Sequence, residues 1–112
     1  MNSLYQANAH DATRKYNAIY GKEIDTDLTL KIIQNFLNAY KEKTRRSYTG
    51  AIDQGDIAKA LNGCTINLGR FTEPDAYKAF FERKDKAAAE RVTFADVINH
   101  LVSKSIGERF GV

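Results

Sequence analysis

The chain has 112 residues, a net charge of +3 and a sequence pI near 9.0. Its single cysteine excludes an internal disulfide, and no apolar run approaches the roughly 18 residues of a membrane-spanning helix. One proline and seven glycines are few chain breaks for this length, so we expect one mainly α domain rather than a β-sandwich with many turns.

Two helices are predicted in the first half of the chain, from apolar residues that recur every three or four positions. The apolar stripe of the first helix consists of Tyr5, Ala9, Ala12, Tyr16 and Ile19, and Gly21 is expected to end this helix. Thr26 is a candidate N-cap for the second helix, whose stripe consists of Leu30, Ile33, Phe36, Leu37 and Tyr40. The cations that follow stand where the helix dipole favours positive charge; they are Lys41, Lys43, Arg45 and Arg46.

Three further helices are predicted in the second half. The third helix is expected over residues 53–61, with Asn62 and Gly63 as its C-terminal stop. Residues 64–71 are open between helix and a short extended stretch, because they are rich in β-branched residues. Pro74 suits the first turn of a fourth helix, whose core face is expected to hold Tyr77, Phe80 and Phe81. The last helix begins at Thr93, which has capping-box spacing to Asp96; its stripe consists of Phe94, Val97, Ile98, Leu101 and Val102.

Residues 36–61 and 77–101 follow one pattern twice. Each segment has aromatic residues on an incoming helix, a polar loop, a β-branched residue and then an acidic residue before an apolar helix. The β-branched residue of the first copy is Ile52, and that of the second copy is Val92. Each is followed four positions later by an aspartate, Asp56 or Asp96. This repeat indicates two related helix-loop-helix units.

The stretches TGAIDQGDIAKAL and ERVTFADVINHL resemble the second halves of EF-hand loops with their exiting helices. The resemblance spans about residues 30–103 and implies a pair of EF-hand-like units at residues 26–62 and 72–104. It also implies a short two-stranded bridge that pairs Ile52 with Val92, while Gly50 supplies the sharp turn of the first loop. Residues 1–25 would add an extra N-terminal helix and loop.

The resemblance does not extend to the calcium ligands. A calcium loop needs carboxylates at its early positions and a bidentate glutamate at its end. Ala87 and Ala89 occupy ligand positions of the second loop, and Asp56 and Asp96 replace the final glutamates. We therefore expect no metal and no other cofactor.

Paired EF-hands form a cup whose apolar groove accepts an amphipathic helix. The resemblance therefore implies a protein-binding adaptor or a structural subunit of a larger assembly, which binds its partner without calcium. The candidate groove residues are Phe36, Tyr40, Leu61, Phe80, Val97, Leu101 and Val102.

A second interpretation concerns residues 54–71, which also resemble a helix-turn-helix. Its second helix would run over residues 65–71 and read base edges with Asn67 and Arg70. Arg45 and Arg46 would then lie near the phosphates. Gly69 inside the proposed reading helix and the low net charge weigh against this DNA-binding alternative.

A third interpretation is a small helical inhibitor protein of no known family, whose sequence would look similar. Catalysis is not expected, because neither His10 nor His100 is followed four positions later by a metal-binding or acidic residue, and no nucleophile motif surrounds Cys64. The first twenty residues lack the apolar segment of a secretory signal, so we expect an intracellular protein.

Overall fold

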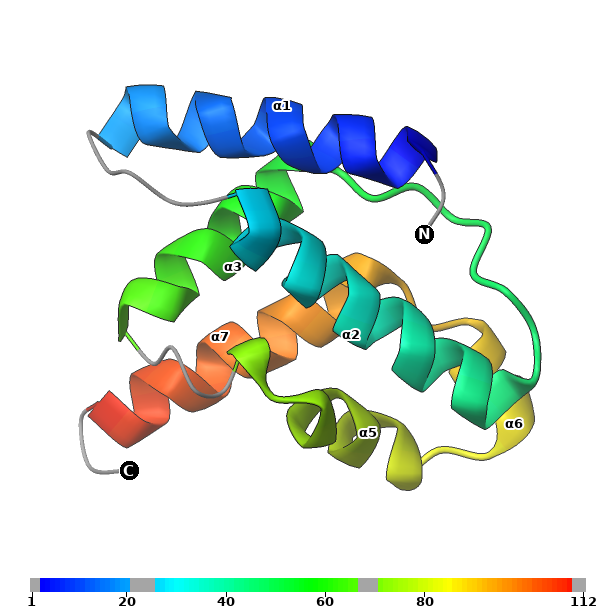
Figure 1. The fold of residues 1–112 in the computed structure, drawn as a ribbon. Coiled ribbons are helices and arrows are strands. Elements are labelled where there is room, and N and C mark those ends of the chain that lie inside the picture. Colours follow the sequence, from blue (N-terminus) through cyan, green and yellow to red (C-terminus); the bar gives the residue numbers. More distant parts are fainter. Residues whose placement is uncertain (1–2, 21–25, 67–70, 110–112) are drawn as a thin grey trace.

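A computed structural model describes residues 3–20, 26–66 and 71–109, with side chains at 9–18, 26–64 and 71–104. These residues form helices and no strand, which confirms the mainly α class (Figure 1). The helices are α1 (Ser3–Tyr20), α2 (Thr26–Thr44), α3 (Gln54–Ile66), α5 (Pro74–Glu82), α6 (Lys86–Glu90) and α7 (Phe94–Arg109). The additional N-terminal helix is thus present, and it lies across α2 and α3.

The helix α1 packs through a face of small residues and one aromatic ring. Ala9, Ala12 and Tyr16 are buried there, as their predicted stripe requires. Between α1 and α2, the buried hydroxyls of Thr13 and Thr29 share a hydrogen bond of 2.6 Å. Small side chains let the two helices approach closely, and the shared bond satisfies two hydroxyls that burial would otherwise penalise.

A polar clasp joins α1 to the first turn of α3. Gln54 donates from Nε2 to Asp11 Oδ2 at 2.6 Å and accepts from Lys15 Nζ at 2.8 Å through its own Oε1. Lys15 also lies 3.4 Å from Asp11. The pKa of the Asp11 carboxyl is lowered from its ordinary value, first by the hydrogen bond from Gln54 and then by Lys15.

The clasp gives a pH-dependent prediction. Because the folded-state pKa of Asp11 is lowered, its contribution to stability is present above its unfolded value near 3.8 and is lost as the pH falls through the lower folded value. Gln54→Ala should raise the pKa of Asp11 toward its ordinary value, as measured by a carboxyl ¹³C NMR titration. Gln34→Ala, at an exposed position on α2, is the matched control and should leave the Asp11 titration unchanged. An unaltered Asp11 titration in the Gln54 variant would contradict this account.

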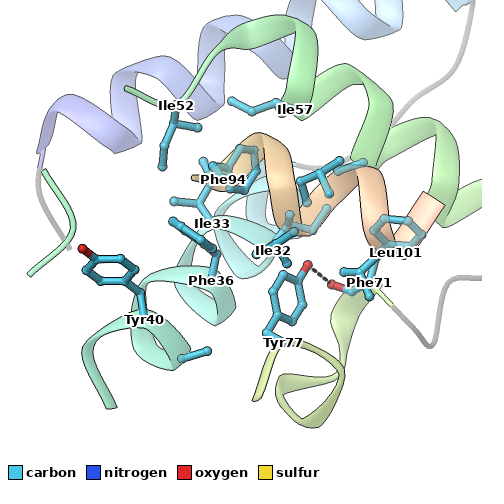
Figure 2. Packing of buried hydrophobic residues seen from close by; sticks show 14 of the residues in the cluster. Ile32, Ile33, Phe36, Tyr40, Ile52, Ile57, Phe71, Tyr77, Phe94 and Leu101 are labelled. Carbon is cyan, nitrogen blue, oxygen red and sulfur yellow. Dashed lines mark hydrogen bonds between the residues drawn. The ribbon is translucent and has the colours of Figure 1, made fainter. Parts of the chain in front are cut away.

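The core is centred on the Phe36 ring of α2, which is fully buried (Figure 2). Its centroid lies 4.8 Å from that of Tyr48 in the linker before α3 and 5.3 Å from that of Phe94 in α7, both edge to face. Phe81 of α5 lies 6.4 Å away. Aromatic pairs at such distances and tilts add to the free energy of burial, so this cluster holds three helices and a linker together.

The predicted two-stranded bridge between Ile52 and Val92 is wrong. Both side chains are buried, but the backbone N–H of Val92 donates to the carbonyl of Ala89 at 3.1 Å, which closes α6. The three alanines at 87–89 are strong helix formers, and the Asp85 carboxylate caps the helix through the N–H of Ala88 at 2.8 Å. The segment predicted as the second loop therefore contains a short helix. The N–H of Val92 bonds to this helix and not to a strand at Ile52.

The predicted starts of α5 and α7 are confirmed. Pro74 begins α5, although the residue in the N-cap position is Glu73, whose side chain makes no capping hydrogen bond. Before α7, the N–H of Thr93 donates to Asp96 Oδ2 at 3.0 Å and the N–H of Asp96 donates to Thr93 Oγ1 at 3.2 Å. This reciprocal pair is the capping box expected from the sequence.

The helix stop predicted at Asn62 and Gly63 is wrong, because α3 continues to Ile66. Gly63 is buried, and a Cβ built on it would lie 2.4 Å from Cζ of the Phe71 ring. Phe71 is itself fully buried, and its carbonyl accepts a 2.8 Å hydrogen bond from the Tyr77 hydroxyl (Figure 2). The glycine thus serves close packing within a helix rather than ending the helix.

Gly63→Ala should therefore destabilise the protein by about 1–3 kcal/mol, because the added methyl group overlaps the ring of the fully buried Phe71. Gly55→Ala on the same helix is the matched control. Gly55 is exposed, and a Cβ built on it would lie 2.9 Å from Oδ1 of the exposed Asp53 side chain, which accepts a hydrogen bond from the Gly55 N–H. Because this exposed side chain can turn away at the cost of one exposed hydrogen bond, the control should lower stability by about 1 kcal/mol at most. Urea unfolding of both variants decides the matter, and equal effects would contradict the packing role.

Candidate partner-binding site

Most of the predicted groove residues lie in the core. Phe36, Leu61, Val97 and Leu101 are at most 1% exposed, and Tyr40 is 7% exposed. Phe80 and Val102 are partly buried at the edge of this core. The described structure therefore brings the seven residues into one apolar cluster, in which five of them are buried and two are partly buried.

A hollow of about 400 Å³ lies instead between α5 and α7. Its lining combines apolar side chains with charged ones: Ala76, Ala79, Phe80, Glu82, Arg83, Lys84, His100, Leu101 and Lys104. Phe80 and Leu101 are the two predicted groove residues that contribute to it. The hollow is therefore the part of the predicted surface that a partner can reach.

The sequence of α5 explains why the hollow exists. Ala76 and Ala79 lie four and one positions before Phe80, and their small side chains leave space beside its ring. The neighbouring Phe81 turns into the core, where it is 2% exposed. Phe80 packs edge to face against Phe81 at 5.6 Å and against His100 of α7 at 5.1 Å. The ring is thus fixed in position while part of it faces the hollow.

The rim of the hollow is basic. Lys84 Nζ lies 4.9 Å from the centroid of the Phe80 ring, which is a cation–π distance. Arg83 and Lys104 are exposed at the rim, and Glu82 is the one carboxylate in the lining. Sequence reasoning placed Phe80 and Phe81 on the core face of their helix and named Phe80 as a groove candidate as well, but it did not single out these cations. The run Phe80–Phe81–Glu82–Arg83–Lys84 was the available signal, because adjacent residues on a helix point about 100° apart, so one of the two rings is directed toward the edge of the core face.

A second, smaller hollow of about 180 Å³ lies between α2 and α5. Its lining is Ala39, Glu42, Lys43, Lys78, Phe81 and Glu82. Two lysines and two glutamates balance in charge there, and Lys78 lies 3.7 Å from Glu42 as an ion pair across the two helices. This hollow has less apolar surface to offer, because Phe81 is buried.

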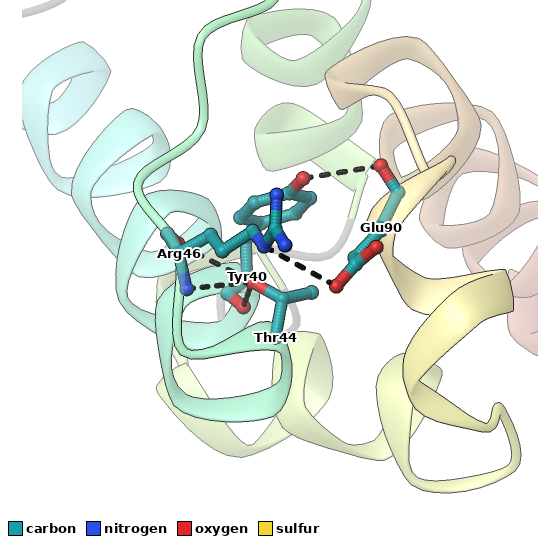
Figure 3. Close-up of polar contacts among 4 residues, drawn as sticks. All are labelled: Tyr40, Thr44, Arg46 and Glu90. Carbon is teal, nitrogen blue, oxygen red and sulfur yellow. Dashed lines mark hydrogen bonds and ion pairs between the residues drawn. The ribbon is translucent and has the colours of Figure 1, made fainter.

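The residues of the DNA-binding alternative are only partly placed. Arg45 and Arg46 are exposed after α2, and Arg45 has a positive φ of 62° that ends the helix. Arg46 Nε lies 3.5 Å from Glu90, whose backbone carbonyl accepts a 3.1 Å hydrogen bond from the Tyr40 hydroxyl (Figure 3). Asn67 and Arg70 lie outside the described residues. Since α3 runs through the turn predicted at Asn62, the helix-turn-helix lacks its turn at that position.

The single cysteine, Cys64, is buried in the fold. Burial raises the pKa of the Cys64 thiol to about 12, so it stays protonated at neutral pH. Within residues 9–18, 26–64 and 71–104, no three His, Cys, Asp or Glu side chains are grouped as a metal site would require. In the same described part of the chain, no helix has the length and apolar character needed to cross a bilayer.

No protein-family model, curated protein or solved structure matches this chain. The function is therefore inferred from the hollow between α5 and α7 and from the residues that form it. In this hollow the partly accessible ring of Phe80 lies beside the basic side chains of Arg83, Lys84 and Lys104, and it packs against Phe81 of the core.

Proposed function

We propose that this chain is a non-catalytic protein-binding adaptor or structural subunit. It receives a helix of a partner protein at the hollow between α5 and α7 without calcium. Phe80 is the observation that supports the proposal, because a large aromatic side chain faces an open hollow while its neighbours hold it in place. Aromatic and arginine side chains in such positions contribute most of the binding energy at protein interfaces.

The helix order supports an EF-hand-like arrangement as the framework of this adaptor. The helices α2 and α5 begin the two predicted units and pack together, and the exiting helices α3 and α7 pack together as well. Related elements thus contact one another, as two repeats of one unit would. In this proposal no calcium ion separates the helices to open a groove in the core, so the partner binds on the outside of the core.

A small helical inhibitor of no known family remains an alternative, and it would use the same surface. It differs only in its consequence, because an inhibitor blocks the activity of its partner and an adaptor does not. An activity assay of the bound partner, once the partner is identified, separates these two.

The partner can be found through the geometry of the hollow. A photo-crosslinking amino acid at Arg83, on the rim, should capture a partner that the same amino acid at Lys31, exposed on α2, does not capture. Mass spectrometry should place the crosslink on a helical segment with an apolar face. Equal capture at both positions would show that the rim has no special role.

Phe80→Ala should then weaken binding of the purified partner by about tenfold or more, since it removes an anchor. Leu37→Ala is the matched control, because Leu37 is also a partly buried apolar residue but does not line the hollow. Calorimetry should find binding to the Leu37 variant within about twofold of the unmodified protein. If both variants bind as the unmodified protein does, the hollow is not the binding site.

A further inference from the structure

We infer that the partner segment is an acidic amphipathic helix: an apolar side chain enters the hollow beside Phe80, and flanking carboxylates pair with Lys84 and Lys104. This inference rests on the proposed function and specifies the chemistry of its partner. It follows from the charges at the rim and from the position of the Lys84 ammonium group.

The charges at the rim are unbalanced. Arg83, Lys84 and Lys104 contribute three positive charges to the lining, and Glu82 contributes one negative charge. None of the three cations forms an ion pair with another side chain in the described part of the chain. Carboxylates of a partner can therefore pair with these three cations. Such complementary charges would also speed association and favour acidic partners over others.

Some other cations of the described surface are paired with carboxylates of the same chain. Arg46 lies 3.5 Å from Glu90, Lys78 lies 3.7 Å from Glu42 and Lys59 lies 3.9 Å from Asp56. These pairs join or flank helices and so reduce the field that a ligand would meet there. The hollow between α5 and α7 differs because its cations surround an apolar floor instead of their own carboxylates.

Lys84 occupies the place that the partner would take. Its ammonium group lies over the Phe80 ring, and its side chain is partly buried. An apolar side chain that packs on the ring displaces this group, and the displaced charge then needs a new partner. A carboxylate one helical turn from the apolar anchor provides that partner, because positions three or four apart lie on the same face of a helix.

The spacing of the rim supports a helical ligand. Lys84 is carried by the segment after α5, whereas His100 and Lys104 lie one turn apart on α7. The cations thus flank the floor of Ala76, Ala79, Phe80 and Leu101 from two elements. A helix lying between them presents one apolar stripe to the floor and acidic positions to both sides. A nucleic acid strand would need a continuous row of cations along its phosphates, which this arrangement does not form.

The test uses the full chain labelled with ¹⁵N and two synthetic amphipathic peptides of about five helical turns. The peptides share one leucine and phenylalanine stripe, and their polar faces carry either glutamate or lysine. The glutamate peptide should bind about tenfold more tightly or better, with the largest amide shifts on α5 and α7. A poly-dT oligonucleotide of similar charge serves as the nucleic acid comparison.

Charge reversal at the rim gives the decisive comparison. The double variant Lys84→Glu with Lys104→Glu should weaken binding of the glutamate peptide by about tenfold or more. The control Lys31→Glu with Lys41→Glu changes the net charge equally at exposed sites on α2 outside the hollow and should stay within about twofold.

Each other outcome overturns the inference. Equal binding of both peptides would remove the acidic preference while leaving helix binding at the hollow intact. If the glutamate peptide causes no shifts at the hollow, the inference fails, and the proposed function is then decided by the comparison of the Phe80 and Leu37 variants. Oligonucleotide binding at the hollow that equals the peptide and is lost in the same double variant would assign the rim to nucleic acid.

Discussion

The burial of Phe36 is the constraint on which the rest of the structure depends. Its ring contacts the rings of Tyr48 and Phe94 edge to face and lies near Tyr40 and Phe81. These residues come from α2, the linker before α3, α5 and α7, so one side chain connects elements that are distant in sequence. Once the cluster has formed, the faces of α2 and α7 that the EF-hand resemblance assigned to a groove have little free surface left.

In the proposed function, this closed core determines where the partner binds. Leu101 is 1% exposed and forms part of the floor of the hollow, while Phe80 remains partly accessible beside two alanines. The adjacent Phe81 makes the contact with Phe36 in the core. Phe80 packs against Phe81 and lies at the edge of the core, between α5 and α7. Binding on the outside of a rigid core needs no conformational opening, and a preorganised surface loses little entropy on association.

The sequence predicted the helices better than their contacts. The stripes of α2 and α7, the described part of the α1 stripe and the capping box at Thr93 are local signals, and the structure confirms them. The side chains of Tyr5 and Ile19, the other members of the α1 stripe, lie outside the described residues. Gly63 was assigned to a helix end because its packing against Phe71, eight positions later, cannot be read from neighbouring residues. The bridge at Val92 failed because three alanines behind the Asp85 cap favour α6 over an extended loop. Periodicity marked Phe36 and Leu61 as apolar face residues, but the same pattern describes a groove and a core.

The core is closed in this structure, and Phe80 is its accessible aromatic neighbour. Paramagnetic relaxation by a soluble gadolinium chelate, read on side-chain protons of the calcium-free protein, tests this directly. We expect strong relaxation for Phe80 and His100 and weak relaxation for Phe36, Phe94 and Leu61. If Phe36 and Leu61 relax as strongly as Phe80, the lobe is open in solution, and the partner site belongs in the groove rather than at the hollow between α5 and α7.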